Sequence, residues 1–471
     1  MTSRLLSILR FYLSVLMAAT AITAVAQSNI AIYRNDGEFN QLKLEAGAKI
    51  NHTVGENTPR IHIHDWLRGN TSIPVAAIDS CVMRQYDIPA LYITLTDYPD
   101  ADMLWDKELY LNAKIALQGN GYCDDLPETS VQVRGRGNTT WSMPKKPMRI
   151  KFSKKTSVAG LRKSKNMVLL NNYVDPTLMR NVISMWLARR LGIPYANSME
   201  PCHVFVNNNY AGAYTMTEKL GINSGSVDID ESVGMLFEIS SEFDEKYKFY
   251  SDSLNMPVMV KDPDFDELFE DEPEGLTPDQ RLALWQKDFN RAEALAIQGK
   301  GAEAFDMESF TRYLMLYNIV ANHEIGDLKS IYIHKKSLGE DEKYFFGPAW
   351  DFDVAFNFND ISNDSYTSRP PELALHTPTL MGHLLDTPES RAIYCELWEN
   401  FKNEIFPELL EFIDTYAALI EPSAKHNGLR WPTSGPLYDW AYHITSFDFH
   451  SHVDQLRAWL IARVEYLDKN Y

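Results

Sequence analysis

The chain has 471 residues, which is room for two or three domains and a large hydrophobic core. Apolar residues make up 45% of the chain and charged residues 23%, an ordinary balance for a globular protein. The formal net charge of −19 argues against a nucleic-acid-binding protein, because phosphate backbones are recognised by basic surfaces.

The N-terminus has the pattern of a secretory signal peptide over residues 1–26. Arg4 and Arg10 give a positively charged start, residues 11–24 are apolar, and residues 24–26 (AVA) form a small-x-small cleavage site. The apolar run is too short for a membrane-spanning helix, and no second candidate span follows it. We therefore expect a mature protein that has no transmembrane segment and is secreted, periplasmic or held at the cell surface.

Residues 27–85 contain short alternating segments separated by polar turns, which predicts a small β-rich accessory module. The main domain would then cover residues 86–471. The four cysteines are far apart in the chain and show neither CxxC spacing nor another metal-ligand spacing. We expect isolated buried thiols, with one or two disulfides as the alternative in an oxidising compartment.

Residues 130–152 (SVQVRGRGNTTWSMPKKPMRIKF) concentrate positive charge in this acidic protein. Two predicted strands flank a glycine-containing loop, and glycines let backbone N–H groups approach and surround an anion. Arg134, Arg136, Lys146 and Lys151 are therefore candidate nucleotide-binding residues that would face a triphosphate. The alternative is a β-hairpin with a solvated basic face, and the lack of a GxxxxGK[ST] motif excludes a P-loop NTPase.

A helix and a hairpin follow the basic stretch. Apolar positions at helical spacing predict a helix over residues 177–191, and the turn-rich NNNYAG sequence predicts a hairpin over residues 203–216. The hairpin leads to Glu218, which could orient a lysine at the nucleotide site. The alternative is a surface salt bridge, which contributes little to stability.

The second half of the chain is mainly helical in its pattern, and a polar loop interrupts it. This loop, residues 322–327 (NHEIGD), follows one predicted helix and precedes a strand–turn–strand pattern. Glu324 or Asp327 in the loop could accept the proton of a hydroxyl nucleophile. Amphipathic spacing predicts the helices over residues 277–298, 306–322, 389–403, 407–420 and 449–469.

Two carboxylates stand at i and i+2 in the segment YFFGPAWDFDVAFNF, residues 344–358. If this segment is extended, Asp351 and Asp353 point to the same side of an apolar, aromatic frame. Two ionised acids in such a frame repel each other and resist desolvation. A hard cation such as Mg²⁺, bound by one or two carboxylates and by substrate phosphates, would offset both costs. The alternative is a solvated turn that caps a short helix at residues 355–359.

Five sequence blocks in a fixed order resemble the CotH kinase family of secreted proteins: RGRGNTTW…PKKPMRIKF, NNYVDPTLMRNVISMWLARRLG, VNNNYAGAYTMTEK, NHEIGDLKSIYIHKK and FGPAWDFDVAF. The resemblance implies an α+β, strongly diverged protein-kinase-like fold. A β-rich N-lobe would cover residues 86–265 and a helical C-lobe residues 275–471. It also implies transfer of the ATP γ-phosphate to Ser/Thr hydroxyls of extracellular or cell-envelope proteins, with Mg²⁺ or Mn²⁺ as the metal.

The same resemblance implies roles for individual residues. The WDxD motif of the family is matched by Trp350–Asp353, so Asp351 and Asp353 inherit its metal-binding role. The catalytic position, which is usually Asp in the family, aligns best with Glu324, and Asp327 is the second candidate. Two other functions stay open. One is an inactive binding or scaffold protein that keeps the fold; the other is a glycan-binding or carbohydrate-active protein, suggested by the paired acids and the many Trp and Tyr residues.

Overall fold

The computed structural model describes residues 28–35, 39–44, 60–65, 69–84, 87–102, 104, 106–356, 380–385, 387–432 and 448–470. The expected signal peptide, residues 1–26, lies outside them. The first described part is a small β-rich unit, in which β1, β2 and β5 form one antiparallel sheet and β3 pairs with β4. These strands span Ser28–Arg34 (β1), Phe39–Leu44 (β2), Arg60–Asp65 (β3), Gly69–Pro74 (β4) and Ile78–Arg84 (β5).

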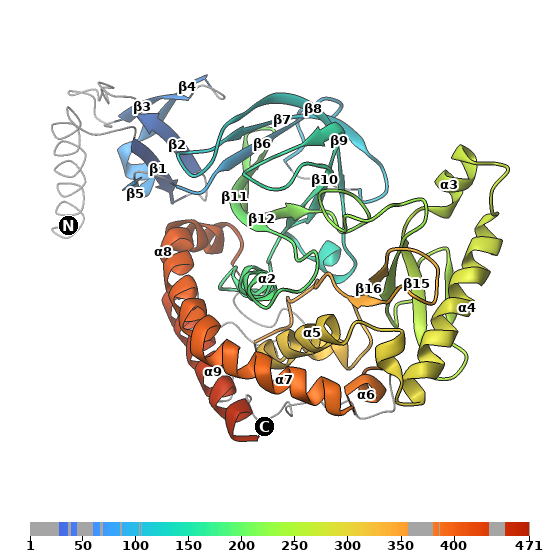
Figure 1. Cartoon of the computed structure of the whole chain (residues 1–471). Helices are drawn as coiled ribbons and strands as arrows, with labels where there is room; N and C mark the ends of the chain where they lie inside the picture. The colour runs from blue at the N-terminus through green and yellow to red at the C-terminus, as the bar shows by residue number, and fades with distance from the viewer. Residues whose placement is uncertain are drawn as a thin grey trace.

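Seven strands close into a barrel in the order β10-β12-β11-β6-β7-β8-β9 (Figure 1). Buried apolar residues at alternate positions, such as Val133 and Ile150, fill the barrel as a core of its own. Val133 pairs with Ile150 across the antiparallel β8–β9 hairpin, whose long loop leaves the barrel at one end. The strands span Ala90–Leu95 (β6), Leu111–Gln118 (β7), Leu126–Gly135 (β8), Met148–Thr156 (β9), Ser164–Leu170 (β10), Met199–Val206 (β11) and Asn209–Glu218 (β12).

A second sheet of five strands follows the barrel, in the order β14-β15-β13-β16-β17. Helices α2, α4 and α5 join it in the larger hydrophobic core, where Phe237 of β13 contacts the rings of Trp285 and Phe289 of α4. These elements span Arg180–Arg190 (α2), Met235–Ile239 (β13), Lys248–Tyr250 (β14), Pro257–Asp262 (β15), Phe265–Asp271 (α3), Pro278–Ile297 (α4), Met307–Val320 (α5), Ile331–Lys335 (β16) and Phe345–Phe346 (β17).

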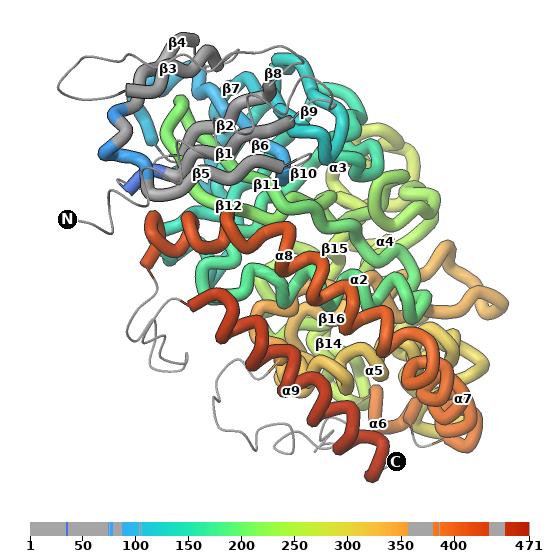
Figure 2. The backbone as a smooth tube through the Cα atoms, turned by 90° about the vertical axis from the view of Figure 1, so that its left-hand side faces the viewer, coloured from blue at the N-terminus to red at the C-terminus, as the bar shows by residue number. Residues whose placement is uncertain are grey.

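The C-terminal helices pack on the outside, with α8 and α9 side by side (Figure 2). Helix α8 joins two parts of the molecule. Near its start Glu408 pairs with Arg190 of α2, and near its end the Asn427 side chain accepts a hydrogen bond from the Ala213 N–H of β12 (3.0 Å). The helices span Leu380–Leu385 (α6), Pro388–Asn400 (α7), Phe406–Arg430 (α8) and Phe449–Asn470 (α9), with a π-helical turn at Phe401–Ile405.

The predicted mixed α+β class is confirmed, because a barrel and a second sheet precede helices in the C-terminal part. The helices predicted over residues 277–298, 306–322 and 449–469 are confirmed as α4, α5 and α9. No helix within the described residues is long and apolar enough to cross a membrane. The boundaries of the accessory module and of the two kinase-like lobes stay predictions.

Two helices differ from their predicted bounds for local reasons. Helix α2 starts at Arg180 and not at residue 177, because the Asp175 side chain accepts the backbone N–H groups of Thr177 and Met179 and holds a turn there. Helix α8 continues to Arg430, past the predicted end at residue 420, although Pro422 lies inside it. Three of the four cysteines are free thiols in the structure, namely Cys123, Cys202 and Cys395.

Candidate active-site cleft

A cavity of about 360 Å³, here called the acid cavity, lies between the barrel and the second sheet. Parts of the chain that are far apart in sequence line it: the β8–β9 loop, α2, and the segments after α5 and β17. Its described lining residues include seven carboxylates and three cations, so the cavity is strongly acidic. The acids are Glu238, Glu242, Asp244, Glu245, Glu324, Asp351 and Asp353, and the cations are Arg136, Lys261 and Lys329.

Asp351 and Asp353 lie in an irregular segment that becomes a turn at residues 353–356, and not in the extended segment that the sequence predicted. Residues 351–356 are here called the aspartate turn. The backbone of Asp351 is left-handed, with φ 64°, and the Asn322 side chain donates a hydrogen bond to its carbonyl (2.8 Å). Aspartate tolerates this conformation better than most residues. Both aspartates nevertheless line the same cavity.

Asn181, at the start of α2, holds the second aspartate in place. Its side-chain oxygen accepts the Phe352 N–H (2.9 Å), and its side-chain nitrogen donates to Asp353 Oδ1 (2.6 Å). Arg180 beside it donates to the Ala355 carbonyl. One helix end therefore sets the position of the aspartate turn. Asn181 is not among the site residues predicted from the sequence, where its only signal is an amide inside an apolar helical pattern.

The structure separates the two candidate catalytic acids. Glu324 lies in a short 3-10 turn, His323–Ile325, and lines the acid cavity. Its Oε2 atom is buried and has no hydrogen-bond partner among the described residues. Asp327 is exposed and does not line the cavity. The geometry therefore favours Glu324 over Asp327 as the acid that meets a bound ligand.

Burial and mutual repulsion raise the pKa values of the cavity acids. Burial, followed by the charges of Asp351 and Asp353, raises the pKa of Glu324 to about 9. Burial and then Asp351 raise the pKa of Asp353 to about 7. Burial raises the pKa of Asp351 as well, against the lowering effect of Arg136. Without a bound metal ion, Glu324 therefore keeps its proton at neutral pH and Asp353 is partly protonated, and a bound cation would favour release of those protons.

The stability of the metal-free protein is expected to fall as the pH rises from 4.5 to about 9. In that range the folded state keeps a proton on Glu324 that the unfolded chain has released, so proton binding favours folding and is lost at alkaline pH. The raised pKa of Asp353 likewise makes the folded state less stable as the pH rises. Melting temperatures in EDTA should be lower at the alkaline end, and Glu324→Gln should weaken this dependence. An unchanged dependence in Glu324→Gln would contradict the raised pKa.

Arg136 is the predicted nucleotide-binding cation that reaches the acid cavity. Its guanidinium lies over the Trp350 ring (5.9 Å from the centroid), and its charge lowers the pKa values of both Asp351 and Asp353. The half-buried side chain thus lies between the loop that carries it and the aspartate turn. A cation in this place can contact phosphate oxygens next to a metal bound by the aspartates.

The other three predicted cations do not share this cavity. Arg134 lies over the Tyr110 ring (4.9 Å), and Lys146 donates to the Trp141 carbonyl within its own loop (2.8 Å). Lys151 lines a second cavity, described below. These residues form one block in the sequence, but Arg134 and Lys151 project from β8 and β9 over the Tyr110 ring (4.9 and 5.5 Å), and Lys146 bonds within its own loop.

Arg136→Gln is expected to weaken binding of Mg·ATP by about 1.5–3 kcal/mol, the contribution of one charge-assisted hydrogen bond. Arg134→Gln and Lys146→Gln remove the same charge from the same stretch but outside the acid cavity, so their affinities should change little. Calorimetric titration of the three folded variants is the measurement. Equal losses in all three would show that the whole block acts through its net charge.

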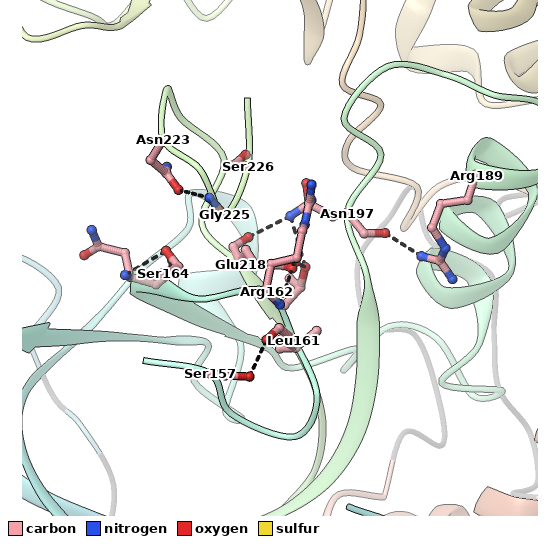
Figure 3. A network of polar contacts seen from close by, with 12 residues as sticks. Ser157, Leu161, Arg162, Ser164, Arg189, Asn197, Glu218, Asn223, Gly225 and Ser226 are labelled. Atoms are coloured by element: carbon pink, nitrogen blue, oxygen red, sulfur yellow. Dashed lines mark hydrogen bonds and ion pairs between the residues drawn. The ribbon is translucent and has the colours of Figure 1, made fainter. Parts of the chain in front are cut away.

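Glu218, the last residue of β12, is fully buried and lines neither cavity. Its carboxylate accepts hydrogen bonds from the Arg162 Nε and backbone N–H (both 3.2 Å), and the Asn197 side chain donates to its carbonyl (2.8 Å) (Figure 3). In the structure Glu218 therefore orients Arg162, and its role at the nucleotide site stays a prediction. The next residue, Lys219, does line the second cavity.

A buried lysine anchors the β8–β9 loop from behind. Lys145 has no exposed surface, and its Nζ donates to the Asn427 side chain of α8 (2.8 Å) and to the Ala213 carbonyl of β12. Asn171, just after β10, donates to the Lys145 and Thr140 carbonyls (2.5 and 3.3 Å). Burial lowers the pKa of Lys145. This lysine of the basic block is a structural anchor that lies away from the acid cavity.

Comparison with known proteins decides the family. The sequence model of the CotH kinase protein family matches residues 133–467, which is more than half of the chain and includes every described residue that lines the acid cavity. The chain belongs to the CotH kinase protein family. Membership confirms the resemblance seen in the sequence; it implies kinase activity, with ATP as the phosphate donor and a substrate to receive the phosphate. No curated protein matches the chain.

The acids of this CotH kinase protein fit a divalent cation that is shared with phosphates. Within the described residues, no group of three or more His, Cys, Asp and Glu side chains is placed to hold a metal ion by itself. Mg²⁺ needs only one or two carboxylates besides phosphate and water oxygens. The raised pKa values of Asp353 and Glu324, and the buried Glu324 oxygen without a partner, are the observations that fit such an ion.

Proposed function

We propose that this CotH kinase protein transfers the γ-phosphate of ATP to Ser/Thr hydroxyls of proteins outside the cytoplasm, in a metal-dependent reaction. The observation that supports this proposal is the meeting of Arg136, Glu324, Asp351 and Asp353 in one cavity, from segments far apart in the chain. Phosphoryl transfer requires positioning and charge neutralisation more than covalent chemistry, and these residues supply both. The signal-peptide pattern supports the location.

Each cavity residue has a distinct task in this proposal. Asp351 would hold Mg²⁺ or Mn²⁺ and Asp353, oriented by Asn181, would assist it. The bound cation would neutralise charge on the phosphates. Arg136, close to both aspartates, would contact phosphate oxygens next to the metal. Glu324 would accept the proton of the acceptor hydroxyl, because it lines the cavity and the nearby cationic charge would lower its pKa from about 9.

An inactive nucleotide-binding protein is the second candidate. The observation that favours it is the pKa of Glu324, because a carboxylic acid that stays protonated at neutral pH cannot accept a proton. This protein would bind Mg·ATP in the same cavity without turnover, and the same residues other than Glu324 would be needed.

Incubation with labelled ATP tests the proposal. Purified protein without residues 1–26 is mixed with Mg²⁺ or Mn²⁺ and with exported proteins of the native cell, and labelled proteins are detected on a gel. We expect label on Ser or Thr of an exported protein or of the kinase itself, and none with Asp351→Asn. Nucleotide binding without label under either metal would select the inactive protein instead.

A further inference from the structure

A second, larger cavity adjoins the acid cavity, and no residue role assigned above uses it. Its volume is about 850 Å³, and it shares Lys261 and Glu245 with the acid cavity. The outer face of barrel strands β9 and β10 and the segment after β12 form its barrel wall. The end of β15 and the start of α3 form the facing wall. A ligand in one cavity therefore lies next to a ligand in the other.

The barrel wall of the second cavity carries five cations that have no carboxylate partner. The chain has 64 acidic residues and a net charge of −19, yet none of the five forms an ion pair with any described residue. Acids and bases elsewhere in the described chain do pair, as Lys261 does with Glu238 and Glu245 (2.8 and 2.9 Å). The five cations are Arg149, Lys151, Lys155, Lys165 and Lys219.

The polar contacts that these cations do make are with uncharged groups. Arg149 donates to the Asn166 side chain (2.9 Å), and Lys155 donates to the Ser224 hydroxyl (2.8 Å). The Lys219 ammonium has no hydrogen-bond partner among the described residues. Burial, with the charge of Arg149, lowers its pKa to about 8, although Asp262 and Glu245 act in the opposite direction. Positive charge that the fold does not neutralise is therefore available to a ligand from outside, and a cleft concentrates its field.

The facing wall is acidic, and some of its carboxylates have partners on their own side. Asp264 caps α3 by accepting backbone N–H groups, and Asp266 pairs with Lys246. Asp262, at the end of β15, instead reaches the barrel wall, where it accepts the Ile222 N–H (2.5 Å), and its charge raises the pKa of Lys219. The second cavity thus has one wall of available positive charge and one acidic wall opposite it.

We propose that the second cavity binds an extended segment of the acceptor protein that carries acidic side chains at alternate positions. Successive side chains of an extended chain point to opposite sides, so the acidic ones would meet the barrel wall and the intervening hydroxyl or basic ones would meet the acidic wall. The inference rests on the proposed function in one respect. A Ser or Thr hydroxyl of the bound acceptor segment would have to reach the acid cavity, which adjoins the second cavity at Lys261.

The charge pattern favours a peptide over the nucleoside part of ATP. A base and a ribose carry no charge, so they would leave five cations without a counterion. The phosphates belong with the metal-binding acids of the other cavity. An acidic segment of the acceptor would instead form charge-assisted hydrogen bonds with several of the five cations at once.

Peptide binding to the protein without nucleotide tests the proposal. The probe is a short fluorescent peptide in which Glu and Ser alternate, compared with a peptide in which Lys and Ser alternate, and the readout is fluorescence anisotropy. We expect binding of the Glu/Ser peptide that weakens as salt is added. The double variant Lys151→Glu/Lys165→Glu, which changes two exposed side chains of the barrel wall, should lose about tenfold or more in affinity.

Lys154→Glu is the matched control, because Lys154 is exposed on β9 beside the wall but does not line the cavity. Equal binding of the Lys/Ser peptide, or an unchanged affinity of the double variant, would overturn the proposal. Loss of Mg·ATP binding in the double variant, with ATP displacing the peptide, would assign the cavity to the nucleotide and overturn it as well. Because peptide binding is measured without ATP, a failure of phosphoryl transfer alone would count against the proposed function and leave this result intact.

Discussion

Asp351→Asn is expected to abolish metal-dependent binding of ATP and all phosphoryl transfer, while the metal-free protein melts at the same temperature or higher. The Asp351 carboxylate is surrounded by other acids, and its pKa is raised by burial and by Glu238. Removing its charge therefore relieves repulsion when no cation is present. The same change removes the oxygen that would bind the metal, so Mg·ATP should no longer raise the melting temperature.

Thermal melts of both proteins, with and without Mg·ATP, separate this result from a purely structural role. If Asp351 only stabilised the turn, its replacement would lower stability by about 0.5–2 kcal/mol, as loss of a capping side chain does, and would spare the ligand effect. Glu242→Gln is the control. It also removes a carboxylate from the cavity lining, but one that is paired with Lys329 (3.1 Å). A less stable Asp351→Asn protein that keeps the full response to Mg·ATP would refute the metal-binding role.

Glu324→Gln is expected to lower kcat by about 10²–10⁴-fold, the usual contribution of a general base. Its affinity for Mg·ATP should change much less, because the proton of the acceptor hydroxyl moves only during transfer. Glutamine keeps the size of the side chain and the Glu324 backbone N–H contact with Asn322 (3.2 Å). Single-turnover measurements with saturating labelled ATP give the rate of the transfer step.

Asp327→Asn is the matched comparison, since Asp327 lies three residues away on the exposed side of the same loop. It should leave the transfer rate nearly unchanged. A large loss in Asp327→Asn with a normal Glu324→Gln would reverse the assignment and would require the loop to move when the acceptor binds. Near-equal, small losses in both would mean that the acceptor proton leaves without help from this loop.

Much of the fold followed from patterns that act over short distances. The amphipathic spacing of residues 278–297 and 307–320 gives α4 and α5 almost to the residue, because a buried stripe repeats every three to four positions. The closure of seven strands into a barrel was not predicted. The pairing of β10 with β12 and of β11 with β6 depends on contacts between strands that a local pattern does not encode.

The candidate site was predictable where one short motif supplies the chemistry. The WDxD segment pointed to Asp351 and Asp353 without knowledge of the fold, and both line the acid cavity. Asn181 was missed, because its contact with Asp353 joins residues 172 positions apart. The basic block predicts four nucleotide-binding cations, and in the structure only Arg136 of them lines the acid cavity, because the path of the loop and not closeness in sequence decides where each side chain lies.

Helix α8 connects two segments that carry residues of the acid cavity, α2 and the β8–β9 loop. At one end it is tied to α2, which positions Asp353, and at the other it is tied through Asn427 to Lys145 in the loop that carries Arg136. All the residues proposed to bind phosphate or metal precede residue 355, yet their spacing depends on a helix that ends at Arg430. A fragment that keeps the geometry of the acid cavity must therefore contain α8 as far as Asn427, and not only the stretch with the motifs.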